Sequence, residues 1–144
     1  MPTACVIDPA RRLVLSRTWG VVRVDEMLAL NEAIASDPRF RPDFSQFVDM
    51  GAVTEVDIAT DVLRLFVAKV PFGAGARRAL VAGSDVVFGM ARMYATLAGG
   101  RQGEFHVFRG VDLALDWLGF GAESAALRAL LAAAPPLGST PPAS

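Results

Sequence analysis

The stretch RRALVAGSDVVFGMARMYATL, residues 77–97, decides the fold because it joins a strand to a helix. The apolar run 79–82 has the length of a buried strand, and Gly83 interrupts it. Ser84 and Asp85 follow with side-chain oxygens that can cap the helix predicted after them. Such joints are typical of layered α/β domains, in which ligands usually lie beyond the carboxyl ends of the strands. The stretch therefore predicts an α/β fold and directs the search for a site to this joint.

The chain ahead of the joint begins with two strand-like runs, 4–8 and 13–19, with Gly20 ending the second. The Asp8-Pro9 step between them favours a turn, so we expect an antiparallel hairpin. Asp25 is expected to cap a helix with an apolar stripe, and this helix ends before Pro38.

Residues 45–49 are predicted to form a buried central strand, in which Phe47 and Val48 face opposite layers. A loop is expected over 50–56, and a helix is expected to begin near Asp57. The predicted core face of that helix consists of Ile58, Val62, Leu65 and Phe66.

The chain after the joint predicts a helix closed by Gly99-Gly100, a strand over 104–108 and two final helices over 111–118 and 123–133. Strands that alternate with helices imply right-handed crossovers. We therefore predict an α/β fold with a mainly parallel sheet of about five strands, an antiparallel N-terminal edge hairpin and four to five helices. Residues 1–134 are expected to form a single domain, and the Pro/Ser-rich tail 135–144 is expected to be flexible.

Composition excludes several classes of function. The 144 residues are 53% hydrophobic and 20% charged, and the formal net charge of −1 argues against nucleic-acid binding. No run approaches the roughly 18–20 apolar residues of a transmembrane helix, and the start of the chain has no leader pattern. The single Cys5 cannot form an intrachain disulfide, so we expect a cytoplasmic protein. All the basic residues except Lys69 are arginine, which fits the coding bias of a GC-rich bacterial genome.

Several segments resemble the SpoIIAA-like family, which comprises STAS-type domains related to anti-sigma-factor antagonists and, more distantly, to lipid-exchange domains. The resemblance spans about residues 3–119 and is carried by RLVL (12–15), FVD (47–49), VTEV (53–56), RRALV (77–81), VFGMARMY (87–94), VFR (107–109) and ALDWLG (114–119). It implies a SpoIIAA-like fold, and much of this branch has no assigned biochemical role.

Regulatory members of the wider family are phosphorylated on a serine that follows an aspartate after the third strand. Here Asp49 is followed by Met50 and Gly51, and Thr54 is the only hydroxyl in the expected loop. The resemblance therefore does not imply that phosphorylation by a kinase switches the binding partner of this chain. A phosphate on Thr54 near a helix N-terminus would still be electrostatically favourable.

The predicted helix 85–98 is apolar nearly all round, which makes it the most informative candidate site. Its second apolar face could line a small cavity, pack on a second copy of the chain or be covered by the last helix. Arg92 would then lie at the rim and could pair with an acidic group. The candidate ligand or partner face consists of Phe88, Met90, Arg92, Met93 and Tyr94.

Other reactive side chains are isolated in the sequence. His106 is the only histidine and Cys5 has no basic neighbour, so we expect no metal site and an inert, buried thiol. Asp49 and Asp85 follow adjacent predicted strands and could form a carboxylate pair for acid/base chemistry. The loop candidates at strand ends are therefore Asp49, Thr54, Ser84 and Asp85.

These features predict a non-enzymatic protein-interaction or regulatory module that self-associates as a homodimer through the helix 85–98, without a cofactor. A first alternative is a carrier or sensor of a small apolar, lipid-like ligand. A second alternative is an enzyme that uses Asp49, Ser84 and Asp85, although no nucleophile–base pair is visible.

Overall fold

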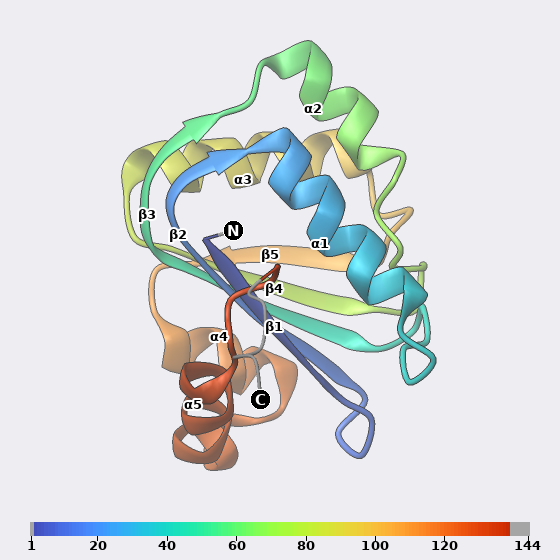
Figure 1. Ribbon diagram of the computed structural model, residues 1–144, viewed down its shortest axis with the longest axis vertical. Coiled ribbons are helices and arrows are strands. Elements are labelled where there is room, and N and C mark those ends of the chain that lie inside the picture. Colours follow the sequence, from blue (N-terminus) through green and yellow to red (C-terminus); the bar gives the residue numbers. More distant parts are fainter. Residues whose placement is uncertain (1, 139–144) are drawn as a thin grey trace, which may run out of the picture.

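The computed structural model describes residues 2–138 and contains one five-stranded sheet (Figure 1). The strands are β1 (Thr3–Asp8), β2 (Leu13–Arg23), β3 (Ser45–Asp57), β4 (Arg77–Ala82) and β5 (Glu104–Phe108). The helices are α1 (Val24–Ser36), α2 (Thr60–Val67), α3 (Asp85–Ala98), α4 (Val111–Leu118) and α5 (Ser124–Ala133), with the 3₁₀ turn η1 (Gly121–Glu123) ahead of α5.

The strands lie side by side in chain order, β1-β2-β3-β4-β5. β1 and β2 are antiparallel, and every other neighbouring pair is parallel. This arrangement confirms the predicted mixed α/β sheet with an antiparallel edge hairpin.

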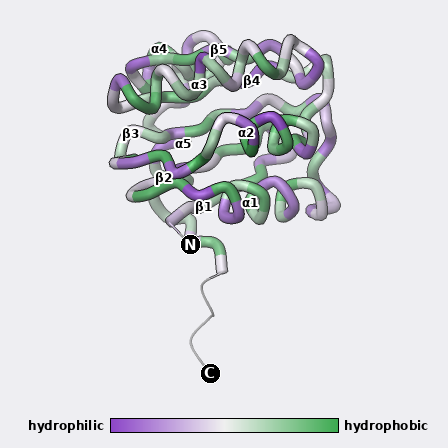
Figure 2. Tube along the Cα trace, turned by 90° about the horizontal axis from the view of Figure 1, so that it is seen from above, coloured by the Kyte–Doolittle hydropathy of each residue, from purple (hydrophilic) through white to green (hydrophobic). Residues whose placement is uncertain are grey.

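The direction of the crossovers explains how the helices are layered. Each crossover from β2 to β5 advances one strand in the same direction, so right-handed connections place α1, α2 and α3 on one face of the sheet. Figure 1 shows α4 and α5 on the opposite face, and Figure 2 shows α1, α2 and α3 in that order across their layer. The result is a sheet between two helical layers.

Alternation along the strands divides the core into two parts. Val48 packs toward α1–α3, whereas its neighbour Phe47 packs toward α4 and α5, as predicted. β4 alternates in the same way, with Leu80 on the first face and Val81 on the second. Each face of the sheet therefore has its own apolar core.

The expected loop over 50–56 is wrong, because β3 continues through it to Asp57 and pairs with the far end of β2. The strand pairing shifts register near Gly20, which has φ 71° and continues β2 rather than ending it. These irregularities bend the β2–β3 ribbon over the helical layer in Figure 1. Buried Val22 and Val53 explain why the ribbon stays paired.

Two helix starts also differ from prediction. α1 begins at Val24 without a side-chain cap, so Asp25 lies in its first turn. α2 begins at Thr60, which rotates the buried stripe to Leu63 and Val67 and leaves Leu65 68% exposed. The predicted caps of α3 are confirmed: Ser84 Oγ accepts a hydrogen bond from the Val87 amide, and Gly99 adopts a left-handed conformation.

The chain beyond α5 returns to the sheet edge. Pro136 forms an isolated bridge with Ala4, and the Leu137 amide donates a hydrogen bond to the Thr3 carbonyl at 2.8 Å. The rest of the predicted flexible tail, 139–144, lies outside the described residues. None of the helices within residues 2–138 is both long enough and apolar enough to cross a bilayer.

Candidate functional site

A cavity of about 100 Å³ lies between the sheet and the helices α1, α2 and α3. It is partly open to solvent and its walls are chiefly apolar. We call it the helix–sheet cavity.

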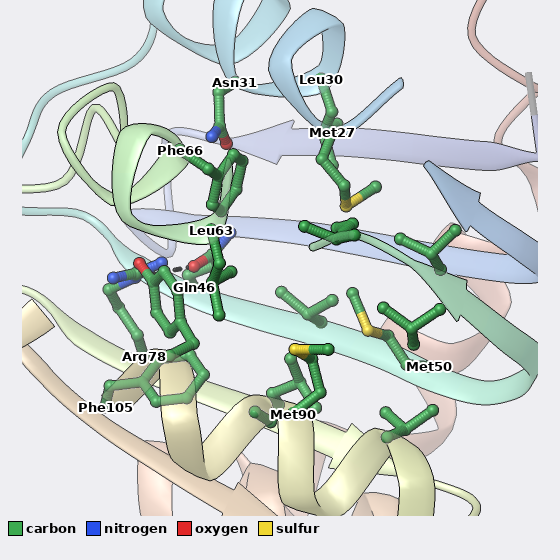
Figure 3. A pocket seen from close by; sticks show the side chains of 18 residues that line it. Met27, Leu30, Asn31, Gln46, Met50, Leu63, Phe66, Arg78, Met90 and Phe105 are labelled. Carbon is green, nitrogen blue, oxygen red and sulfur yellow. Dashed lines mark hydrogen bonds between the residues drawn. The ribbon is translucent and has the colours of Figure 1, made fainter. Parts of the chain in front are cut away.

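Apolar side chains from all three helices line the helix–sheet cavity. Met27 and Leu30 come from α1, Leu63 and Phe66 from α2, and Met90 from α3 (Figure 3). Met50 adds a third thioether from β3. Unbranched methionines adapt to differently shaped apolar groups, so these walls can repack around a guest.

Two polar side chains of the cavity, those of Gln46 and Arg78, lie together at one end. Gln46 on β3 pairs in register with Arg78 on β4, and Arg78 pairs in register with Phe105 on β5. Figure 3 shows these three side chains at the end opposite Met50, with Asn31 reaching down from α1 beside Phe66. The cavity is therefore amphipathic, with a polar end and an apolar end.

Arg78 is the unusual member of this group, because it is only 5% exposed and is the one buried charged side chain within residues 2–138. Its Nε donates a hydrogen bond to Gln46 Oε1 at 2.8 Å. Its guanidinium carbon lies 5.0, 5.4 and 5.2 Å from the ring centroids of Phe72, Tyr94 and Phe105. Burial lowers the pKa of Arg78 from its ordinary value, which reflects the cost of holding the charge away from water.

Two polar atoms of the cavity have no hydrogen-bond partner among the described residues. They are Arg78 Nη1 and Asn31 Nδ2, and both belong to side chains at least nine-tenths buried. Both are donors, because guanidinium and amide nitrogens carry hydrogens and accept none. The polar end of the cavity therefore presents unused donors, for which the matching group is an acceptor.

The structure divides the predicted α3 face. Met90 and Tyr94 line the helix–sheet cavity, since they share one side of α3. Phe88, Arg92 and Met93 do not line it; Arg92 is exposed and Met93 is 40% exposed. Burial raises the pKa of Tyr94, whose hydroxyl donates to Gln102 Oε1 at 3.1 Å.

The strand-end candidates each have a local role. Asp49 Oδ1 accepts from the Gly51 amide at 2.8 Å, and Asp85 Oδ1 accepts from Arg109 Nη2 at 2.8 Å. No hydrogen bond within residues 2–138 joins the two carboxylates. Ser84 caps α3, and Thr54 is exposed within β3 rather than in a loop before α2.

The two remaining reactive side chains lie outside the cavity. His106 is exposed on β5, where its ring lies 4.7 Å from that of Trp117. Burial raises the pKa of the Cys5 thiol to about 12, which keeps it protonated and unreactive at neutral pH. Residues 2–138 contain no group of three His, Cys, Asp or Glu side chains arranged to hold a metal ion.

A second cavity, of about 220 Å³, lies on the other face of the sheet between α4 and α5. Its cations already have partners: Arg17 donates to the carbonyls of Leu131 and Ala134, and Arg128 pairs with Asp112 at 2.8 Å. This cavity therefore offers no unpaired buried charge to a ligand.

The polar end was missed from the sequence because the search followed the carboxyl ends of the strands. Gln46 and Arg78 lie near the amino ends of β3 and β4. A signal was present, since alternation places Arg78 on the same face as Leu80 and Gln46 on the same face as Val48. Asn31 gives no such signal, because a polar residue is expected on the exposed side of a helix with an apolar stripe, yet it is only 8% exposed.

Comparison with known proteins supports the fold. The chain is similar to the crystal structure of an uncharacterised DUF3478-family protein with a SpoIIAA-like fold from Shewanella loihica PV-4, with a TM-score of 0.53 and 20% identity. The match covers 81% of this chain and 93% of that chain. No protein-family model matches the chain, and no curated protein matches it. The likeness establishes a SpoIIAA-like fold and leaves the function to be argued from the cavity.

Proposed function

Starting from a SpoIIAA-like fold with a cavity under its helical layer, we propose that this protein binds a small apolar molecule and acts as its carrier or sensor. The observation that supports the proposal most strongly is the helix–sheet cavity itself, which is chiefly apolar and partly open. Burial of apolar surface drives such binding in proportion to the area removed from water.

The side chains of the cavity suit this role. Ligand sites are commonly apolar cavities with a few convergent polar groups, and this cavity has three methionines in its walls, with Met50 at the end opposite Arg78. Its volume is small beside the roughly 300–1,000 Å³ of many ligand sites, so a short acyl chain is a better match than a bulky cofactor. α2 has only eight residues and covers part of the cavity, so its displacement offers a route of entry.

Methionine methyl NMR tests this proposal directly with 1-octanol as the probe. Met27, Met50 and Met90 line the cavity, whereas Met93 is an exposed control on the same helix as Met90. In protein labelled with ¹³C at the methionine methyls, 1-octanol should shift the signals of the three cavity methionines and leave that of Met93 in place. A shift of Met93 alone, or no shift at saturating probe, would refute binding in the cavity.

A second candidate function is self-association through α3. Val86 is 65% exposed and Met93 is 40% exposed on this helix, and Leu65 on neighbouring α2 is 68% exposed. Exposed apolar side chains on neighbouring helices favour a contact with another protein surface.

Sedimentation velocity of the wild-type chain and of Met93→Asp tests this candidate. A dimer that uses this surface should dissociate in the variant, because a carboxylate would be buried in an apolar contact. An unchanged mass in both proteins would remove α3 from consideration as an interface.

A further inference from the structure

We infer that the polar end of the helix–sheet cavity is a carboxylate-binding subsite, so that the ligand is an amphiphile with a carboxylate headgroup at Arg78 and an apolar tail toward Met50. This inference rests on the proposed function and specifies the chemical class of its ligand. It follows from the unbalanced charge of Arg78, its unpaired Nη1 donor and the apolar walls of the cavity.

The charge of Arg78 has no counterion within residues 2–138. None of the ion pairs found there includes Arg78, although it is buried. A guanidinium does not lose its proton in proteins, so its burial stays costly until an anion pairs with it. The ring faces of Phe72, Tyr94 and Phe105 attract the cation but leave the Nη1 donor unpaired.

The charge of the site favours a carboxylate over a phosphate. Arg78 is the one buried cation in the wall of the cavity, and a carboxylate matches it with a single negative charge and an oxygen that accepts from the unpaired Nη1. A phosphate monoester would bring three oxygens and a charge of about −1.5 to −2, for which one buried cation is too little compensation. The other contacts of the guanidinium leave one donor for the ligand. Gln46 accepts from Nε and the Tyr94 hydroxyl also interacts with the guanidinium, whereas Nη1 has no hydrogen-bond partner within residues 2–138.

Isothermal titration with octanoate and 1-octanol tests the inference, since the two probes share a tail and differ in the headgroup. The proteins to compare are the wild type, Arg78→Met and the control Arg77→Met. Arg77 is the next residue on β4, but it faces the other layer, where it lies over Trp117 at 4.2 Å. The wild type and Arg77→Met should bind octanoate at least about tenfold more tightly than 1-octanol. Arg78→Met should lose this preference or reverse it.

The outcomes separate the inference from the proposed function. Equal binding of both probes by the wild type would overturn the carboxylate subsite and leave apolar binding intact. A preference that persists in Arg78→Met would also overturn it. Binding of neither probe would overturn the proposed function and the inference together.

A measurement on the wild type alone avoids dependence on the folding of a variant. Octanoate labelled with ¹³C at its carboxyl reports its own ionisation in the complex. If Arg78 pairs with it, the carboxyl pKa in the complex should lie at or below that of free octanoate, because a nearby cation stabilises the charged form. A bound pKa above the free value would show a carboxyl buried without a counterion and would contradict the inference.

Discussion

Arg77 and Arg78 are adjacent on β4 but lie on opposite faces of the sheet. Arg77 is exposed on the α4–α5 face, where its guanidinium stacks on Trp117 and lies 4.0 Å from Glu104. Arg78 is buried on the α1–α3 face, where no carboxylate within residues 2–138 pairs with it. The same residue type is thus a surface side chain on one face and an uncompensated buried cation on the other.

The comparison shows that a cavity points to a ligand when buried polar groups in its wall have no hydrogen-bond partner. The α4–α5 cavity is the larger of the two, at about 220 Å³, but Arg17 and Arg128 already have partners there. The helix–sheet cavity is smaller and contains the unpaired donors of Arg78 and Asn31. Natural cores rarely retain such groups, so their presence supports the proposal that the ligand binds on the α1–α3 face.

The largest expected change in the free energy of unfolding comes from truncating a buried leucine on each face of the sheet. Leu13 is fully buried on the α4–α5 face, whereas Leu80 lines the helix–sheet cavity. Leu13→Ala should lower the free energy of unfolding by about 2–5 kcal/mol, and Leu80→Ala by less, because part of its surface already borders empty space. Urea unfolding measures both. A larger loss for Leu80→Ala would indicate that the cavity is filled in solution by its own walls.

A smaller effect is expected at Gln46, the hydrogen-bond partner of Arg78. Gln46→Leu leaves the Arg78 Nε donor unpaired and should lower the free energy of unfolding by about 1.5–3 kcal/mol, since hydrogen bonds to charged groups contribute in this range. The double variant Gln46→Leu/Arg78→Met should recover most of the loss, because no buried donor is left behind. Additive losses in this double-mutant cycle would argue against coupling of the two side chains.

Arg78→Met should raise the free energy of unfolding of the ligand-free protein by about 1 kcal/mol, as an apolar side chain replaces a buried charge. Arg77→Met should lower it by about 0.5–1 kcal/mol through the loss of the contact with Trp117. Thermal or urea unfolding of the two variants in parallel measures this difference in sign. A clear loss in Arg78→Met would assign that arginine a structural role, supported by its aromatic neighbours.

The smallest effect is expected at Arg128 on the α4–α5 face. Its ion pair with Asp112 is exposed, so Arg128→Ala should change the free energy of unfolding by less than about 0.5 kcal/mol. The affinity for octanoate should also stay unchanged, since Arg128 borders only the other cavity. Weaker octanoate binding by Arg128→Ala would indicate that octanoate binds on the α4–α5 face instead.

Structural features that depend on residues close together in the sequence were predictable. Alternation gave the opposite facing of Phe47 and Val48, and Ser84 and Gly99 marked the ends of α3. The extent of β3 was not predictable in this way, because a bent ribbon is held by its partner strand rather than by local propensity. The start of α2 was misplaced for a similar reason, since tertiary packing selected Leu63 and Val67 as its buried stripe.

The candidate site was harder to predict than the fold. Met90 and Tyr94 were proposed because the sequence of α3 is apolar nearly all round. Arg78, Gln46 and Asn31, in contrast, come from three separate elements. Only the strand register and the position of α1 bring these three side chains to one cavity. That no side chain among residues 2–138 supplies a counterion for Arg78 is a tertiary property, which no local sequence pattern contains.

Intermolecular NOE measurements on the complex of the wild-type protein with octanoate test the central claim most directly. The account predicts contacts from the terminal methyl of octanoate to the methyl groups of Met27, Met50 and Met90. It also predicts contacts from the methylene next to the carboxylate to the rings of Phe105 and Tyr94, which lie beside Arg78. Contacts confined to the exposed Met93 and Leu65, or a ligand in the reverse orientation, would contradict it.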